Sequence, residues 1–559
     1  MDKKKALKWV GIYLLVTLIG ALAYYFALPA INVFSEGFWF FLAFLIFIYT
    51  LPLTGVKVGV EILKAGQIKP RVARPQKGKG KWMLLALLPV AVVLLGTLVS
   101  STFFNAKRYA AVIDVNEAVF SEDMPETENV TNIALMDSAT AAIVGNRTLG
   151  SLSDVVSQFE IAPSYTQINF ERTPQKVANL EYAGFFKWLG NREEGLPGYV
   201  MVDPVNNTAE YKALSVSMRY VDSAYFGEDL SRRLRFDYPT KILGTPSFEV
   251  DDEGNPYFIV PCYRPRVGLF GASDVSEVII FDPTDGSSEI FSLDATPAWI
   301  DIVYDGYLAT EKYNWKGLLS GGFWNSVIGN KDCKQTTDDF GYIVIGDDVW
   351  YFTGVTSVNS DQSNIGFIIS NARTGEYKFY SVIGAEEHSA MTAAQGEVQH
   401  MNYTASFPAL INVRGEATYI MVLKDAGGLV KLYALVNVEQ YNIVATGATQ
   451  EDAKNAYLEK LVTEGVLSPE DVVTPEDPDG ATAEEFVLTV DAITPVVTAG
   501  ESWLYLRGVT DAGKTVLVKS KIAENESVLL LSVGDAVSVK ATPTENESVY
   551  TLISFGMNG

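Results

Sequence analysis

Residues 367–382, FIISNARTGEYKFYSV, predict a strand, a tight turn and a second strand. Two related segments occur earlier in the chain, YVMVDPVNNTAEYKAL at 199–214 and VIIFDPTDGSSEIFSL at 278–293. In each, an apolar strand is followed by Asp or Asn, by Pro or Ala, by two variable residues and by Gly or Asn. The Asp or Asn side chain can bond to the turn backbone, Pro presets φ, and Gly or Asn tolerates a positive φ. These residues therefore specify a turn and need no ligand.

A different hairpin precedes two of these segments, FEVDDEGNPYFIVP at 248–261 and GYIVIGDDVWYFTGV at 341–355. A further pair of hairpins follows in ALINVRGEATYIMVLKDAGGLVKLYALVNVEQYNIVATG at 409–447. The chain is therefore predicted to be mainly β, with repeated antiparallel meanders of about four strands each. Because a meander on its own exposes an apolar face, we expect the meanders to stack on one another.

The last meander and the helix predicted before it resemble the PepSY family. The helix covers Glu386–Gln399 and the strands cover 406–445. The final hairpin of that family typically reads strand, Asp, small residue, Thr-Gly, strand. The earlier hairpin at 370–382 of this chain has such an ending too, with Asn371 in place of the Asp and with Thr374 and Gly375 matching. The resemblance extends over about 247–447. It implies a helix packed on antiparallel strands, an extracytoplasmic location, and binding or inhibition of partners, with no catalytic residue to carry over.

A β-propeller is the alternative architecture, because its blades are also four-stranded. The Asp or Asn turns of the three related segments are 79 and 89 residues apart. This spacing is about twice the length of a propeller blade, which favours PepSY-like meanders. Outside the N-terminal region, three segments are the clearest predicted helices, which makes the fold α+β in part. They are Ser153–Phe159, Glu386–Gln395 and Gln450–Thr463.

Residues 1–103 are predicted to form a three-helix membrane anchor. Three apolar runs, Trp9–Ile31, Phe38–Leu53 and Trp82–Phe103, are long enough to cross a bilayer. A cleaved signal peptide is the other interpretation of the first run, but that run is too long and a second apolar run follows it. The lipid bilayer is therefore the first expected partner.

Basic residues predict the orientation of this anchor, because they concentrate on the cytoplasmic side of membrane spans. The loop between the first two runs has none, whereas the N-terminus and the loop at 54–81 are basic. We therefore expect a cytoplasmic N-terminus and an extracytoplasmic chain from about residue 104, in a bacterial plasma membrane. The basic residues are Lys3, Lys4, Lys5 and Lys8 before the first run, and Lys57, Lys64, Lys69, Arg71, Arg74, Lys77, Lys79 and Lys81 in the loop.

The remainder of the chain is strongly acidic. Up to Lys81 the sequence has 12 basic and 3 acidic residues, which leaves 31 basic and 64 acidic residues beyond it, a net charge of −33. Such a charge repels nucleic acid, so no nucleic-acid partner is expected. The organisation predicted for this part is an α+β or β domain at 104–245, the PepSY-like repeats at 246–465, an acidic linker at 466–485 and a C-terminal module at 486–559.

The C-terminal module has five candidate strands and the segment LLSVGDAVSVKAT at 530–542, in which a Gly-Asp turn lets the chain re-enter a sheet. It resembles an OB-fold or a related small β-barrel. Its acidic residues outnumber its basic ones, and Trp503 and Tyr505 share one face of a strand. We expect these two rings to serve a core or an interface and not to stack on bases.

No catalytic constellation is recognisable, so no catalytic or cofactor-binding residue is predicted. The only histidines, His388 and His400, are 12 residues apart, and no standard metal-binding or nucleophile motif includes them. Cys262 and Cys333 are a possible disulfide in an oxidising compartment. Calcium candidates are two carboxylate clusters in turns, Asp282, Asp285 and Glu289, and Asp251, Asp252 and Glu253, although both are turn sequences first.

Three functions agree with these features. The first is a non-catalytic, membrane-anchored extracytoplasmic protein that binds envelope proteins or itself, because repeated units extend a contact surface. The second is an envelope hydrolase with a carboxylate pair, suggested by the acidic and aromatic-rich exterior. The third is an accessory subunit of a larger membrane complex, because three spans exceed what simple anchoring needs.

Overall fold

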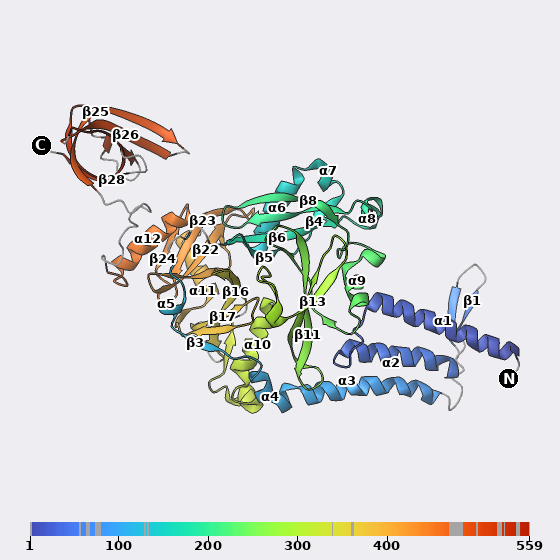
Figure 1. Ribbon diagram of the computed structural model, residues 1–559. Coiled ribbons are helices and arrows are strands. Elements are labelled where there is room, and N and C mark those ends of the chain that lie inside the picture. Colours follow the sequence, from blue (N-terminus) through green and yellow to red (C-terminus); the bar gives the residue numbers. More distant parts are fainter. Residues whose placement is uncertain are drawn as a thin grey trace. The chain divides into compact units, whose positions relative to one another are not determined.

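The computed structural model divides the chain into two compact units, Met1–Leu461 and Val462–Gly559. The first holds the apolar helices and most of the sheets, and the second holds a small barrel (Figure 1). Most of the expected linker at 466–485 and of the basic loop at 54–81 lies outside the described residues. The structure describes residues 3–54, 58–62, 68–72, 80–127, 130, 133–337, 339–358, 363–468, 484–498, 501–511, 513–522, 528–529, 531–543 and 548–557.

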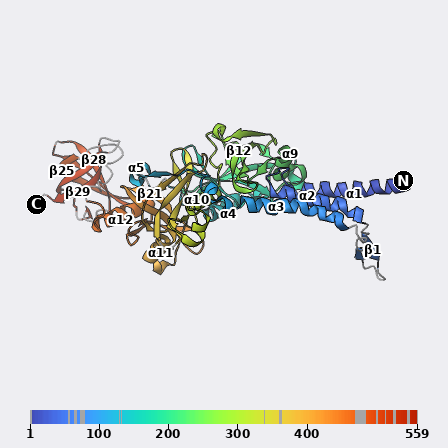
Figure 2. The ribbon, with the colours of Figure 1, turned by 90° about the horizontal axis from the view of Figure 1, so that it is seen from below.

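Three long apolar helices open the chain, as predicted. Their apolar stretches, Ala6–Ala27, Glu36–Thr54 and Gly80–Ser100, are long and apolar enough to cross a membrane, and at most 17% of each is buried in the protein. Both ribbon views show the helices lying side by side (Figures 1 and 2). They are α1 (Lys3–Ala27), α2 (Glu36–Thr50) and α3 (Leu87–Ser100), with a short hairpin of β1 (Val58–Ile62) and β2 (Ile68–Val72) between the last two.

The rest of the first unit repeats one module of a helix and five strands four times. In every module the third strand pairs along one edge with both the first and the second strand, and along its other edge with the fourth, which pairs with the fifth. The first module is α6 (Ser138–Gly150), β4 (Phe159–Ile161), β5 (Thr166–Phe170), β6 (Thr173–Tyr182), β7 (Leu196–Asp203) and β8 (Thr208–Met218). The second is α9 (Leu230–Asp237), β9 (Ile242–Leu243), β10 (Ser247–Val250), β11 (Pro256–Val267), β12 (Gly271–Phe281) and β13 (Ser288–Ser292). The third is α10 (Gly306–Leu319), β14 (Lys334–Thr336), β15 (Gly341–Ile345), β16 (Asp348–Ser357), β17 (Ser363–Asn371) and β18 (Tyr377–Tyr380). The fourth is α11 (Glu387–Glu397), β20 (Thr404–Ala405), β21 (Ala409–Val413), β22 (Glu416–Lys424), β23 (Val430–Asn437) and β24 (Val444–Gly447).

Two short strands extend the third sheet: β3 (Asn116–Ala118) runs parallel to β18, and β19 (Gly384–Ala385) pairs with β17. The domain boundary expected at residue 246 falls inside the second module, since α9 and β9 precede it. The helix α12 (Gln450–Thr463) has the bounds that the sequence predicts. The helix expected at Ser153–Phe159 is shorter, because α7 (Ser153–Val156) ends before Phe159 enters β4.

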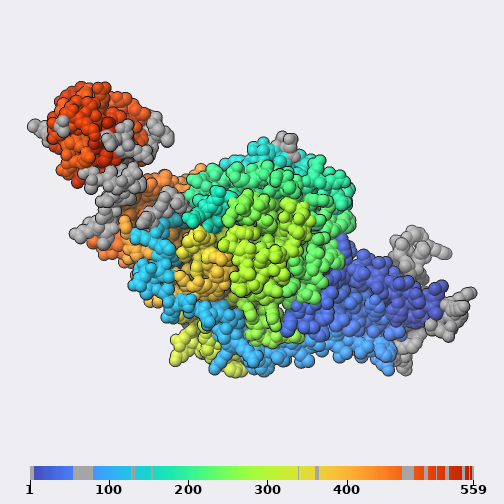
Figure 3. Space-filling model, in the orientation of Figure 1, coloured from blue at the N-terminus to red at the C-terminus, as the bar shows by residue number. Residues whose placement is uncertain are grey.

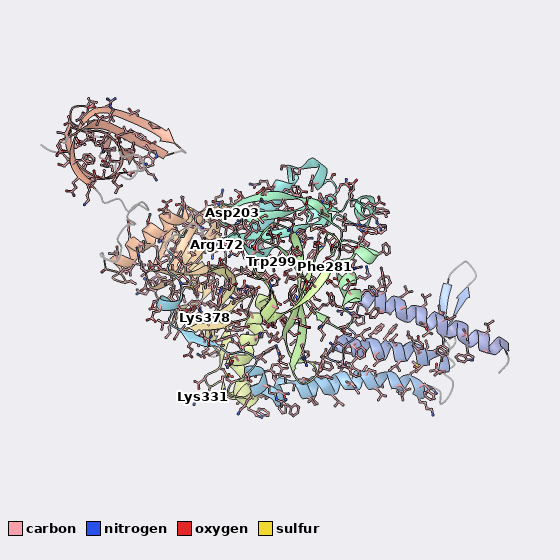
Figure 4. All side chains as sticks on the ribbon, in the orientation of Figure 1. Arg172, Asp203, Phe281, Trp299, Lys331 and Lys378 are labelled. Carbon is pink, nitrogen blue, oxygen red and sulfur yellow. The ribbon has the colours of Figure 1, made fainter. Side chains whose placement is uncertain are left out.

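In the first three modules, the fourth and fifth strands are joined by the turn that the sequence predicted. The Asp203 carboxylate accepts bonds from the N–H groups of Val205 and Asn206 at 2.8 and 2.9 Å. The Asn371 side chain accepts two equivalent bonds, from Arg373 and Thr374, both at 2.9 Å. Figure 4 labels Asp203 at the end of β7 and Phe281 at the end of β12.

The fifth position of this turn has a positive φ in the three related hairpins, at Asn207, Gly286 and Gly375, with values of 54°, 77° and 73°. The fourth module uses Asn437, whose side chain accepts a bond from the N–H of Gln440 at 2.8 Å. Its turn is longer, which is why the segment is hard to align with the other three. The turn interpretation of these residues is confirmed.

Replacing Asn371 by Ala is expected to lower the free energy of unfolding by about 1–3 kcal/mol, because the buried Asn371 side chain loses three hydrogen bonds, two of them from turn N–H groups. Asn371 is 2% exposed and also donates a bond to Asp348 at 2.9 Å. Chemical unfolding of the full chain in detergent measures the change. The control is Asn206→Ala in the turn of the first module, where the side chain is exposed and only donates. Equal stability of Asn371→Ala and the unaltered chain would contradict the prediction.

The modules stack in pairs, as expected for sheets with an apolar face. One core joins the first and second modules, with Val177 and Val200 packed in the same cluster as Phe248 and Phe258. A second core joins the third and fourth modules and includes Phe352 and Tyr419, among others. A smaller cluster around Tyr304 and Leu308 covers the other face of the second sheet.

The second unit is a closed five-stranded barrel in the order β25-β26-β27-β29-β28. Its interior is filled by alternate residues of each strand, among them Leu504 and Leu506 of β26. Trp503 lies on the outer face of β26, partly covered, with the Lys519 and Lys521 ammonium groups 5.7 and 5.4 Å from its ring. The strands are β25 (Glu484–Thr498), β26 (Glu501–Thr510), β27 (Thr515–Lys521), β28 (Ala536–Pro543) and β29 (Val549–Met557).

Candidate ligand-binding site

The calcium candidates serve the turns in which they lie. Asp282 accepts bonds from the N–H and hydroxyl of Thr284 at 2.7 and 2.6 Å, and Asp285 accepts one from the N–H of Ser287 at 2.7 Å. Glu289 lies on β13 opposite Ile280. Asp251 accepts bonds from the N–H groups of Glu253 and Asn255 in the second of the two clusters. Within the described residues, no three His, Cys, Asp or Glu side chains are grouped as a metal site.

The two cysteines are free thiols buried in different parts of the first unit, so the possible disulfide is not formed. Cys262 belongs to the core shared by the first two modules, and burial raises the pKa of its thiol to about 12. Cys333 is 2% exposed near the end of α10, where its sulfur accepts a bond from Asn325 and donates to the carbonyl of Leu318.

The histidines are exposed. His388 on α11 lines a shallow groove with Glu386, Glu439 and Tyr441, and His400 lies in the single helical turn after α11.

A cavity of about 650 Å³ lies where the chain leaves α3 and meets the second and third modules. Its aromatic lining includes Tyr109, Tyr263 and Trp315, and its carboxylates are Asp305 and Glu311. None of the described residues that line it is basic. The remaining lining residues are Thr102, Phe270, Gly271, Ala272, Ser273, Tyr307 and Leu308.

The cavity exists because the end of α3 is held against the β11–β12 hairpin. The hydroxyl of Ser100 accepts bonds from the N–H groups of Leu269 and Phe270 at 2.8 and 3.2 Å. After Ser100, α4 (Thr102–Ala110) turns along the cavity wall, and the hydroxyl of Tyr109 donates to the Ser100 carbonyl at 2.9 Å. A Cβ on Gly271 would lie 2.4 Å from that hydroxyl, so this approach requires glycine.

The helix α10 supplies both carboxylates of the cavity. Asp305 is its N-cap and accepts a bond from the N–H of Leu308 at 2.9 Å, as capping aspartates do. Its other oxygen accepts a bond from the hydroxyl of Tyr263 at 3.2 Å. Glu311 lies farther along the helix, and burial, together with the charge of Asp305, raises the pKa of its carboxyl group. Trp315 completes this wall and meets the Tyr109 ring edge-on at 5.2 Å.

A buried ion pair lies directly behind this wall. The residue after Glu311, Lys312, is 3% exposed, and its ammonium group lies 2.7 Å from the Asp274 carboxylate of β12. The Tyr304 ring lies 4.7 Å from the same ammonium group, and Arg266 contacts Asp274 at 3.5 Å. Burial lowers the pKa of Lys312, and the Asp274 charge opposes that shift. This pair fixes α10 on the second sheet and thereby fixes the cavity wall.

Sequence reasoning did not identify this site. The segment 311–329 stands out for its aromatic and basic residues. The structure divides it between buried residues, such as Tyr313, and exposed ones, such as Trp324, which is 64% exposed. The one local signal was Asp305, because aspartate is a preferred N-cap residue at a helix start. Comparison of the sequence with models of protein families and with curated proteins gave no match.

Proposed function

We propose that this chain is a membrane-anchored, non-catalytic extracytoplasmic protein that binds envelope proteins or further copies of itself. The observation that carries the proposal is the fourfold repetition of one helix-and-sheet module. Repetition multiplies the exposed surface without adding a reactive group, and this serves contact better than chemistry. Three helices long enough to cross a bilayer, next to these modules, support the anchoring.

The PepSY resemblance and the positive-inside pattern support the same proposal. Each module places a helix beside antiparallel strands, which agrees with the arrangement that the resemblance implies. Basic residues at the N-terminus and at 54–81 favour a cytoplasmic face for those segments and an extracytoplasmic location for the modules, in a bacterial plasma membrane. The barrel of the second unit has the strand number of an OB-fold, and its acidic composition favours a protein partner over nucleic acid.

The cavity beside α10 is the proposed ligand site. Its two carboxylates and five aromatic rings, without a basic residue in the described lining, complement a cationic group such as a lysine or arginine side chain of a partner. The rings would contact the aliphatic part of such a side chain, and Glu311 and Asp305 would accept its hydrogen bonds.

The decisive experiment is the native mass of the full chain after mild detergent extraction from its own membrane, with identification of the proteins that accompany it. A homo-oligomer or a defined set of partners is expected. A lone monomer that brings no protein with it would overturn the binding function. The same experiment tests the accessory-subunit alternative, in which the partners form a membrane complex.

An envelope hydrolase is the second candidate, favoured by one observation: Asp305 and Glu311 line one cavity, and the pKa of Glu311 is raised, as in a general acid. Hydrolysis of envelope glycans or peptides that is lost in Glu311→Gln but retained in the surface control Glu397→Gln would support this candidate. Absence of turnover in the unaltered chain would remove it.

A further inference from the structure

Four large apolar side chains are exposed together beside the end of α1. Phe186 is 83% exposed, Leu189 49%, Phe226 58% and Phe236 52%. We call this surface the α8–α9 face. Phe186 and Leu189 lie on α8 (Phe185–Asn191), a helix inserted between β6 and β7, and Phe236 lies on α9. Such a concentration of exposed aromatic residues on a soluble surface marks a contact site.

The α8–α9 face is continuous with the end of α1. The Arg235 guanidinium donates to the carbonyl of Leu28 at 2.9 Å, just after the last turn of α1. The N–H of Ile31 donates to the carbonyl of Pro239 at 2.7 Å. The Phe236 ring lies 6.1 Å from the Tyr24 ring. Both ribbon views place α9 beside the apolar helices, and Figure 3 shows their blue atoms directly against green atoms of the modules.

The contact extends from α1 to α8 through Arg232. Its guanidinium lies 4.3 Å from the centre of the Tyr25 ring and donates to the carbonyl of Phe226 at 2.8 Å. The Phe226 ring in turn lies 5.7 Å from the buried Trp188 of α8. The helix α8 is therefore linked, through three contacts, to the apolar helix that is proposed to cross the membrane.

Phe226 itself is held in a conformation that a bulky residue rarely adopts. Its φ is +56°, in the left-handed region. Such a backbone costs on the order of 1–3 kcal/mol and persists where the surroundings impose it, often at a functional surface. Here the strained backbone leaves the Phe226 ring 58% exposed, and its carbonyl accepts the bond from Arg232, which lies against Tyr25 of α1.

The charge of this region also differs from the rest of the chain beyond the anchor. Residues 185–241 have eight basic and eight acidic side chains, whereas the chain beyond Lys81 has a net charge of −33. The helix α9 alone has three arginines and one aspartate. A region without net charge that exposes aromatic rings suits the headgroup region of a bilayer, where aromatic side chains concentrate.

We propose that the α8–α9 face inserts its aromatic side chains into the headgroup region of the same bilayer that α1 crosses, so that the first two modules rest on the membrane surface. This inference rests on the proposed membrane anchoring. It makes the membrane a second, peripheral partner of the modules and fixes their orientation above it.

The test places a fluorescent label on the full chain in phosphatidylcholine vesicles that contain a lipid spin-labelled near its headgroup. The labelled variant is Phe186→Cys; the native thiols of Cys262 and Cys333 are buried, and the unaltered chain measures any background labelling. Ile383→Cys is the matched control, because Ile383 is 70% exposed in the segment that joins the third and fourth modules, far from this face in the sequence. Val10→Cys, near the start of the apolar stretch of α1, reports on the anchor.

Quenching of the label at 186 by the spin-labelled lipid, at least severalfold stronger than at 383, is the expected result. If the label at 10 is quenched and the label at 186 is not, the membrane contact is wrong while the anchor stands. If neither is quenched, the anchoring itself fails and this inference fails with it. A label at 186 that is shielded from water but not quenched by the lipid would assign the face to a protein partner and overturn the proposal.

Discussion

Replacing Lys312 by Met is expected to lower the free energy of unfolding by about 3–5 kcal/mol, because it leaves the Asp274 carboxylate buried without its nearest partner. The side chains of Lys312 and Asp274 are 4% and 9% exposed, so water can replace the lost contact only in part. Arg266 remains 3.5 Å from Asp274 but is half exposed, and it compensates only in part. Guanidinium unfolding of the full chain in detergent, followed by tryptophan fluorescence, measures the change.

The matched control is Lys212→Met. The Lys212 ammonium lies 2.7 Å from the Glu210 carboxylate, the same separation as in the buried pair, but the two side chains are 37% and 68% exposed. Exposed pairs contribute about 0–1 kcal/mol, so this variant should remain close to the unaltered chain. The double variant Lys312→Met, Asp274→Asn should recover part of the loss, since no buried charge is left. Similar effects for Lys312→Met and Lys212→Met would show that burial does not matter here.

The hairpins could be predicted because their determinants are local. Asp203, Asp282 and Asn371 each bond to backbone groups two or three residues away, and a sequence pattern records such bonds directly. The three apolar runs are equally local, since length and hydropathy define them. The helix α12 was predicted with its bounds because Ala453, Tyr457 and Leu461, spaced four residues apart, form its buried face.

The candidate site could not be predicted, because long-range contacts create it. Tyr109, Tyr263 and Asp305 come from three separate segments, and only the packing of α3 on the β11–β12 hairpin brings them together. The helix α10 was not recognised either. Its buried face includes Lys312, and a charged residue at a buried position interrupts the helical spacing of apolar residues on which a sequence prediction depends. The topology shared by the four modules was visible only as hairpins, since the first strand of each module has two or three residues.

A pair of buried carboxyl groups lies where the first two modules meet and makes the stability of the protein depend on pH. Glu249 of β10 is fully buried and accepts bonds from the N–H groups of Asp301 and Ile302 at 2.8 and 3.1 Å. Asp301, which is 5% exposed, accepts a bond from the N–H of Asn169 in β5 at 2.7 Å. Burial raises the pKa of Asp301 to about 7 and also raises the pKa of Glu249. The folded protein therefore retains protons here that the unfolded chain releases.

Replacing Asp301 by Asn is expected to stabilise the protein at pH 8 and to have little effect on its stability at pH 4. With a folded pKa of about 7 against 3.8 unfolded, Asp301 penalises folding only once the unfolded chain has lost its proton. Asp301 therefore does not reduce the free energy of unfolding below about pH 4. As the pH rises from about 4 to about 7, its contribution lowers that free energy by roughly 4 kcal/mol. Asparagine keeps an oxygen for the N–H of Asn169 and has no charge, so the penalty disappears.

Unfolding curves of the two chains at pH 4, 6 and 8, in one detergent, measure this difference. The difference between the unfolding free energies of the two chains cancels the contribution of groups that both share. One such group is Asp123, which has the opposite pH dependence because the hydroxyl of Tyr380 lowers its pKa. The exposed Asp114→Asn is the control and should follow the unaltered chain at every pH. A loss of stability in Asp301→Asn that is equal at pH 4 and pH 8 would mean that Asp301 acts through its hydrogen bond alone. A gain that grows with pH would show that the junction of the first two modules contains a proton-dependent carboxyl group.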